Sequence, residues 1–173
     1  MSLSPFERQV LYQTLIIRHM GAVQEYARQR GSSLNELGVL ICLRYNDSSR
    51  EAFHGGCTQQ EICLREPTMP KQTVSAIVKR LERNGYVTVE PSADDHRTNL
   101  ILLTDKGQEY ANHVLGGFVE AGQHAATQFD DEEFATLLEL TRRFDVEIEQ
   151  ALGVGRLGSA IDVPDVSSGA MPA

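Results

Sequence analysis

One segment, residues 70–107, constrains the fold more than any other part of the chain. It begins with Pro70, whose fixed backbone angle suits the first turn of a helix, and continues with apolar residues spaced three and four apart. Gly85 ends this helix, and two short stretches of strand-forming residues follow at 86–89 and 99–103 with a polar tip between them. This order predicts a helix followed by a β-wing, a shape suited to placing the helix in a DNA major groove and the loop in the adjacent minor groove.

The predicted helix over residues 70–84 has two different faces. The spacing places four apolar residues on one face: Val74, Ile77, Val78 and Leu81. The opposite face and its margins are polar or small: Gln72, Thr73, Ser75, Ala76, Lys79, Arg80 and Arg83. We expect the apolar face to lie on the core and the polar face to meet a partner, although an ordinary solvated helix face has the same pattern.

A shorter helix precedes this one. Thr58 and Glu61 have the spacing of a capping box, in which each side chain bonds a free backbone amide of the first turn. Pro67 ends the helix near Arg65, and only a short turn separates it from Pro70. The two helices therefore have helix-turn-helix spacing.

Four further helices are predicted around this unit, over residues 5–31, 33–45, 105–129 and 130–152. Ser33 with Glu36 forms a second capping box, and Asp130 with Glu133 a third. The glycines at 116, 117 and 122 predict a bend or a close helix contact. The first and last helices carry long apolar stripes that a single subunit would leave in water, so we expect a homodimer.

The expected fold class is mainly α with a small β-wing. Residues 1–152 form one domain, in which helices at about 5–31 and 104–152 serve dimerisation and residues about 33–103 form the winged helix-turn-helix. Residues 153–173 contain four glycines, three serines and two prolines but no aromatic residue. Such a segment buries too little apolar area to offset its ordering entropy, so we expect a flexible tail.

The charge of the chain is unevenly distributed. Its formal net charge is −8, which by itself argues against a nucleic-acid partner. However, residues 65–97 hold six basic and five acidic side chains, whereas residues 105–173 hold four basic and thirteen acidic ones. The excess of acid therefore lies away from the predicted recognition helix.

Apolar runs are too short to span a bilayer, and Glu7 and Arg8 interrupt any signal-peptide core, so we expect a cytoplasmic protein. The odd number of cysteines, Cys42, Cys57 and Cys63, fits reduced thiols and no disulfide framework. Neither a Gly-rich phosphate loop nor a nucleophile elbow is present, so we expect no enzyme, no cofactor and no bound metal.

Several ordered motifs resemble those of the MarR family of bacterial transcriptional regulators, over about a third of the chain. They comprise Thr58-Gln59-Gln60-Glu61, Pro70-Lys71-Gln72-Thr73-Val74-Ser75, the run Lys79 to Val87, Asp95-His96-Arg97 and Leu103-Thr104-Asp105-Lys106-Gly107. At Cys63 to Thr68 the chain departs from the common family pattern, because a proline replaces the usual end of the first helix.

The resemblance implies a homodimeric regulator, a repressor, that binds double-stranded DNA at a pseudo-palindromic operator. It implies groove or phosphate contacts for these residues: Lys71, Gln72, Thr73, Ser75, Lys79, Arg80 and, in the minor groove, the wing residue Arg97. Asp95 would orient Arg97, and His19 would line a pocket for a small apolar or phenolic effector that relieves repression. Gln72 suits an adenine edge, and arginine suits a narrow minor groove.

Other interpretations stay open at this point. The domain could bind proteins instead of DNA, and Arg97 could simply pair with Asp94 or Asp95. His19 could be a buried core histidine. The cysteines could sense oxidants, which requires a low-pKa accessible thiolate, or could be inert small apolar side chains. Metal binding would have to use His54 with Cys57 and Cys63, or His113 with His124, and neither set has a strong zinc spacing.

Overall fold

The fold is described from a computed structural model of the protein, for residues 2–45, 56–91 and 98–154. Its helices are α1 (Pro5–Gln29), α2 (Leu34–Arg44), α3 (Gln59–Arg65), α4 (Lys71–Arg83), α5 (Asp105–Ala126) and α6 (Asp131–Leu152). Its strands are β1 (Cys57–Thr58), β2 (Val87–Pro91) and β3 (Asn99–Leu103). The predicted fold class, mainly α with a small β-wing, is confirmed.

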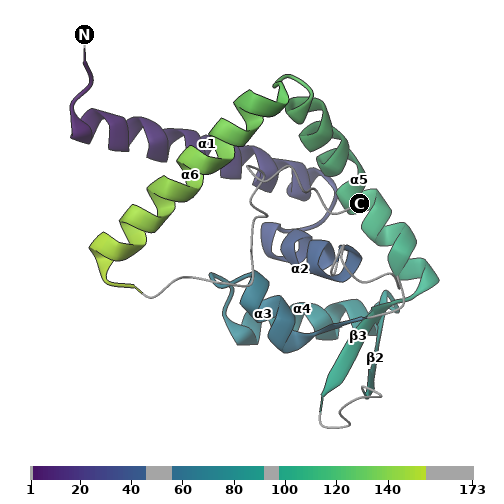
Figure 1. Ribbon diagram of the computed structural model, residues 1–173. Coiled ribbons are helices and arrows are strands. Elements are labelled where there is room, and N and C mark those ends of the chain that lie inside the picture. The colour runs from purple at the N-terminus through teal and green to yellow at the C-terminus, as the bar shows by residue number, and fades with distance from the viewer. Residues whose placement is uncertain (1, 46–55, 92–97, 155–173) are drawn as a thin grey trace.

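Helix α2 forms the centre of the compact part of the molecule (Figure 1). Its sequence is apolar on nearly all sides, and Leu37, Val39, Leu40 and Cys42 are all buried. Around it the core takes apolar side chains from every other element except α6: Ala27, Cys57, Ile62, Val74, Ile77, Val78, Leu81, Val87, Ile101, Ala111, Val114 and Leu115. Tyr45, which follows the last residue of α2, is half exposed.

The sheet is antiparallel and has the strand order β1-β3-β2. In the predicted hairpin, Val87 pairs with Leu103 and Val89 with Ile101. On its other edge β3 also pairs with Cys57 and Thr58, a two-residue strand that the sequence did not reveal. This extra strand ties the start of α3 to the hairpin, so the helix-turn-helix and the wing share one sheet.

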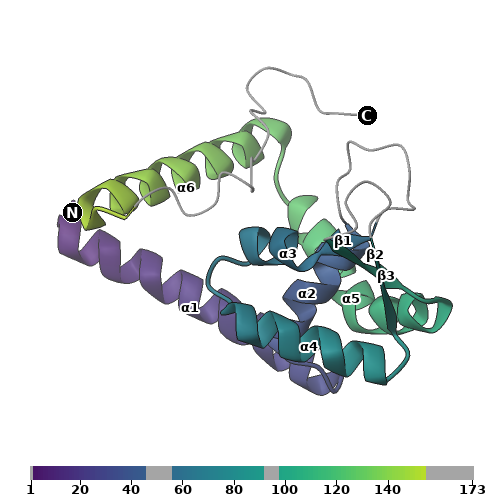
Figure 2. The same ribbon diagram turned by 90° about the horizontal axis from the view of Figure 1, so that it is seen from below.

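Helices α1 and α6 extend away from this core and converge at the end of the molecule remote from the sheet (Figure 2). There the Tyr12 hydroxyl donates to Asp145 Oδ1 at 3.1 Å, and the rings of Tyr12 and Phe144 lie 4.2 Å apart. Helix α6 has no buried residue within the described part of the subunit.

The other end of α1 packs against α5. Tyr26 donates its hydroxyl to the carbonyl of Val114 at 2.9 Å, and the Arg30 guanidinium lies over the Tyr26 ring. A side chain at Gly117 would approach the Tyr26 hydroxyl at 3.1 Å, so this glycine permits the close crossing that the sequence predicted.

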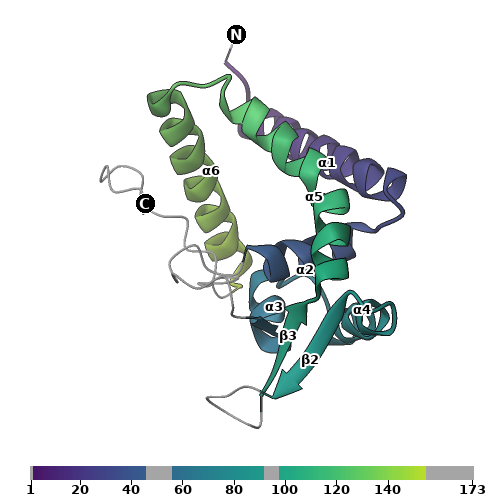
Figure 3. The ribbon, with the colours of Figure 1, turned by 90° about the vertical axis from the view of Figure 1, so that its right-hand side faces the viewer.

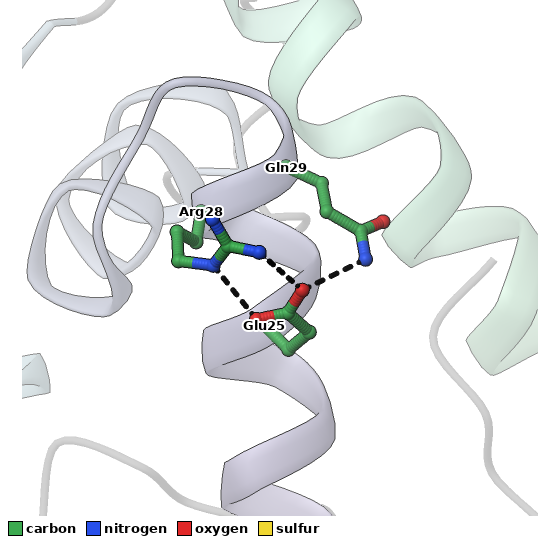
Figure 4. Close-up of polar contacts among 3 residues, drawn as sticks. All are labelled: Glu25, Arg28 and Gln29. Atoms are coloured by element: carbon green, nitrogen blue, oxygen red, sulfur yellow. Dashed lines mark hydrogen bonds and ion pairs between the residues drawn. The ribbon is translucent and has the colours of Figure 1, made fainter.

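In the same turn of α1, Glu25 accepts from Arg28 and Gln29, which lowers the pKa of this exposed carboxyl to about 2 (Figure 4).

Most predicted helix ends agree with the structure. The capping boxes at Thr58 and Asp130 are both complete, with reciprocal bonds to Glu61 and Glu133. Pro70 lies one residue before α4, not inside it, and α5 ends at Ala126, three residues earlier than expected. Within the described residues no helix is long and apolar enough to cross a membrane.

Candidate nucleic-acid interface

Helices α3 and α4 form the predicted helix-turn-helix. Backbone bonds shape the turn, since Met69 N donates to the carbonyl of Glu66 at 2.9 Å, and the buried Met69 side chain anchors the turn in the core. The Gln59 amide donates to the carbonyl of Lys71 at 3.2 Å, which fixes the first turn of α4 against the first turn of α3. The proline at position 67 therefore ends α3 without disturbing the motif.

Helix α4 presents its polar face to solvent. Val74 and Leu81 are fully buried and Ile77 and Val78 nearly so, as the apolar spacing predicted. Of the seven DNA-contact residues expected from the sequence, Lys71, Gln72, Lys79 and Arg80 are exposed on this helix, and Thr73 and Ser75 are half-buried. A shallow hollow of about 480 Å³ lies along this face, lined by Gln72, Thr73, Ala76, Ile77, Arg80 and Arg83.

Helix α4 and the β2–β3 hairpin lie together at the end of the molecule opposite α1 (Figure 1). In Figure 3, where α4 is seen nearly end-on, the hairpin extends past α4 on the side away from α1. The hairpin tip, with the predicted wing residues Asp95 and Arg97, lies outside the described residues. The described part of the hairpin ends at Pro91 in β2 and resumes at Asn99 in β3.

The first turn of α5 is fastened to the end of α4. Thr104 donates its hydroxyl to the carbonyl of Gly85 at 2.7 Å, and Lys106 Nζ donates to the carbonyl of Asn84 at 2.9 Å. Thr104 also caps α5 by accepting from Gly107 N. A Cβ atom on Gly107 would collide with the carbonyl of Tyr86. The motif from Thr104 to Gly107 thus joins α5 to the end of α4 and to the start of the wing.

Glu36 departs from its predicted role. Ser33 caps α2 as expected by accepting from Glu36 N, but the Glu36 carboxylate does not return to the cap. It turns into the subunit, where it is only 4% exposed, and meets Arg80 Nη2 at 2.8 Å. Arg80, expected from the sequence only as a DNA contact, therefore also holds a buried carboxylate. The signal in the sequence was an acidic residue inside a helix that is apolar on nearly every side.

His19 lies on the exposed surface of α1. Within this subunit it is therefore not a core histidine, so that interpretation is wrong. Its role beside an effector stays a prediction.

The cysteines are placed differently from one another. Cys42 and Cys57 are buried, and burial raises the pKa of the Cys42 thiol to about 11 and that of Cys57 to about 12. Cys63 is half-buried. A peroxide sensor needs an accessible thiolate, so Cys42 and Cys57 fit the inert interpretation.

Two sets of metal ligands were considered from the sequence. The first includes His54, which lies outside the described residues. In the ranges that the structure covers, no group of three or more His, Cys, Asp or Glu side chains is arranged to hold a metal ion.

Comparison with known proteins points to one family. Residues 52–98, which contain α3, α4 and β2, match the model of the MarR family. The HTH-type transcriptional regulator BilQ of Clostridioides difficile (strain CD3) is 25% identical over 101 residues, which cover 58% of this chain and 64% of BilQ. The matched part thus spans less than two thirds of that relative.

Two solved structures share the fold over most of its length. NMB1585, a MarR family regulator from Neisseria meningitidis, is 22% identical with a TM-score of 0.66, covering 87% of this chain and 98% of its own. The MepR–DNA complex of S. aureus is 18% identical with a TM-score of 0.64, covering 84% and 99%. The matched segment and the shared winged-helix fold show that this chain is similar to MarR family regulators.

Proposed function

We propose that this chain is a transcriptional regulator, not an enzyme, that binds double-stranded DNA sequence-specifically as a homodimer and represses transcription from a pseudo-palindromic operator. One observation carries the proposal: α4 buries its apolar face and turns Lys71, Gln72, Lys79 and Arg83 to solvent beside the wing. An exposed helix of this kind matches the major groove in width, and its cations match the phosphates that border the groove.

The comparisons support the same proposal. MepR, which has this fold, was solved as a complex with DNA, and BilQ is described as a transcriptional regulator. By analogy with them, the polar face of α4 reads base edges through Gln72 while Lys71 and Lys79 approach phosphates. Thr73 and Ser75 supply hydroxyls at the margin of that face, and Arg97, oriented by Asp95, enters the minor groove.

The homodimer is supported by the apolar surface that the single subunit leaves exposed. On α1 the side chains of Leu15 and Ile17 are 63% and 71% exposed, and on α6 Leu137, Leu140 and Leu152 are also exposed. Monomeric proteins rarely leave so much apolar surface in water. A second copy that covers these helices would present two recognition helices to two half-sites about one helical turn apart.

Relief of repression by a small apolar or phenolic effector is part of the proposal. His19 stands on the exposed side of α1, where a partner subunit and the effector could both reach it. An effector acts only if it binds one spacing of the two recognition helices more tightly than the other.

An electrophoretic gel shift with duplex DNA from the region upstream of the chain's own gene tests the proposal. We expect retardation that weakens steeply as salt rises, because phosphate contacts release counterions. Arg97→Ala should weaken binding and flatten its salt dependence, and an unchanged affinity would remove the wing from the mechanism. No retardation at low salt would contradict DNA binding and favour a protein-interaction module.

A further inference from the structure

Glu36 is the one charged residue that is buried among the described residues, and its carboxylate joins three different parts of the fold. Ser32, in the loop before α2, donates its hydroxyl to Oε2 at 3.0 Å. Tyr110 of α5 donates its hydroxyl to Oε1 at 3.3 Å. Arg80 of α4 reaches Oε2 at 2.8 Å. Both carboxylate oxygens are therefore occupied, as a buried charge requires.

Arg80 is the residue of this cluster that belongs to the recognition helix. Its side chain is still 44% exposed on α4, while its Nη2 atom reaches the buried carboxylate. Apolar packing of Val74, Ile77 and Leu81 holds α4 on the core but is not directional. An arginine–carboxylate contact is directional, because the guanidinium is planar and its donors are fixed in space. The ion pair therefore restrains how α4 can slide or rotate on the core.

The cluster continues from Glu36 to the base of the wing. The rings of Tyr110 and Tyr86 are stacked, with centroids 4.2 Å apart and planes inclined by 3°. Tyr86 lies between the end of α4 and β2, and Lys106 Nζ stands 5.0 Å from the centre of its ring. One connected set of side chains thus links the recognition helix, the first half of α5 and the start of the wing.

We propose that Glu36 is a positioning residue for DNA recognition, which sets the orientation of α4 by holding Arg80 in the subunit. In this arrangement Arg80 serves recognition through the helix that it fixes, and not as a counter-charge to a phosphate. The inference rests on the proposed function, because it concerns how the same helix meets DNA.

Double-mutant cycles on DNA affinity test this proposal. The pair is Glu36→Gln, which keeps the shape of the side chain but removes its charge, and Arg80→Lys, which keeps the charge but removes the planar guanidinium. The matched control pair is Glu36→Gln with Arg83→Lys, since Arg83 lies on the exposed side of the same helix. The DNA probes are the tightest duplex recovered by selection from a random-sequence pool and a scrambled duplex of equal length.

We expect Glu36→Gln and Arg80→Lys each to weaken binding to the selected duplex about tenfold. The double variant should bind the selected duplex no more weakly than the weaker-binding single variant, because both substitutions remove the same contact. Binding to the scrambled duplex and the salt slope should stay unchanged, which separates positioning from general loss of folded protein. In the control pair, the fold-loss in affinity of the double variant should equal the product of the two single fold-losses, because these residues act independently.

Two results would overturn the proposal. Multiplying losses in the Glu36 and Arg80 pair would show that the two residues act independently. Tighter binding of Glu36→Gln to both duplexes would show that the carboxylate competes with phosphate for Arg80. If circular dichroism shows that Glu36→Gln is unfolded, Tyr110→Phe takes its place in the cycle with Arg80→Lys. The same affinity changes are then expected.

The unaltered protein separates this inference from the proposed function. Failure to enrich any duplex in the selection would overturn DNA recognition itself. Specific binding with independent losses would overturn only the positioning role of Glu36.

Discussion

The two buried cysteines show how the core sets the chemistry of single residues. Cys42 of α2 and Cys57 of β1 lie in the hydrophobic core, and burial raises the pKa of both thiols. The carboxylate of Glu66 raises the pKa of Cys42 further, and that of Glu61 raises the pKa of Cys57. Both influences disfavour a negative thiolate, so both raise the pKa. The thiols are therefore small apolar side chains at neutral pH.

Alkylation of the native protein measures this directly. The pKa of Cys42 rises from 9.0 to about 11, so its thiolate fraction at pH 8 is about 100 times smaller than in the unfolded chain. We expect iodoacetamide to modify Cys42 and Cys57 at least that much more slowly in native protein than in denaturant, as followed by peptide mass spectrometry. Fast modification of Cys57 in the folded protein would contradict its burial.

Alkaline pH should also weaken the fold. Because the folded pKa values lie above 9.0, the unfolded chain loses its thiol protons first, and stability that is full below pH 9 declines as pH rises towards 11. Thermal denaturation across this range should show a falling midpoint. Cys42→Ala should reduce the slope even though it lowers the midpoint at neutral pH, and an unchanged slope would argue against the raised pKa.

At the scale of elements, the join between α4, β2 and α5 depends on backbone contact. Gly107 lies against the carbonyl of Tyr86, and Thr104 and Lys106 bond the carbonyls just before it. No side chain fits between the first turn of α5 and this turn. The position of α5 relative to α4 is therefore fixed at close range.

Replacement of Gly107 by alanine should be destabilising. Its Cβ would overlap a backbone carbonyl, which cannot turn away as a flexible side chain can, so we expect a loss of about 1–3 kcal/mol in unfolding free energy. Gly116→Ala is the control in the same helix, since nothing lies within 4 Å of its added Cβ, and it should stabilise α5 by about 0.5–1 kcal/mol. Chemical denaturation measures both, and equal effects of the two changes would contradict the close contact at Gly107.

Local signals predicted most of these elements. Capping residues and apolar spacing gave the six helices and both strands of the hairpin, because these patterns act within a few residues. Strand β1 was missed because a two-residue strand exists only through pairing with β3. The extent of α2 burial was missed for a similar reason, since the neighbours that surround it come from distant parts of the chain.

The sequence predicted which residues form the polar face of α4, but it did not predict the contacts of Glu36 with Arg80 and Tyr110. Helical spacing separated Lys79 and Gln72 from Val74 and Leu81, which the structure confirms. The same spacing gave Glu36 a capping role, because a capping box needs only residues three apart. Its actual partners, Arg80 and Tyr110, lie 44 and 74 residues away in sequence, so only the tertiary fold brings them together.

The whole molecule divides into a buried hydrophobic core and two long helices, α1 and α6, whose apolar side chains are largely exposed. Among described residues α1 buries only Ala27 fully, and α6 buries none. These helices converge (Figure 2), with contacts among Tyr12, Phe144 and Asp145. Many of their apolar side chains stay exposed, among them Leu15 and Ile17 of α1 and Leu137 and Leu140 of α6. In our proposal a second copy covers them.

A charge placed in this surface tests the dimer. Leu15→Glu should shift the protein from a dimer towards a monomer, because burying an unpaired carboxylate in an interface costs several kcal/mol. Gln13→Glu adds the same charge at an exposed polar position of α1 and is the control. Sedimentation velocity over a range of concentrations measures the mass, and a monomeric unaltered protein would contradict the proposed assembly.

The most direct test of the central claim, that the outward face of α4 binds duplex DNA, is the salt dependence of binding by Lys79→Ala. The unaltered protein and the variant are titrated with the same operator duplex at several salt concentrations. The account predicts that the variant binds more weakly and that its slope of log affinity against log salt is shallower by about one. Unchanged affinity and slope would show that this face of α4 does not meet the phosphates.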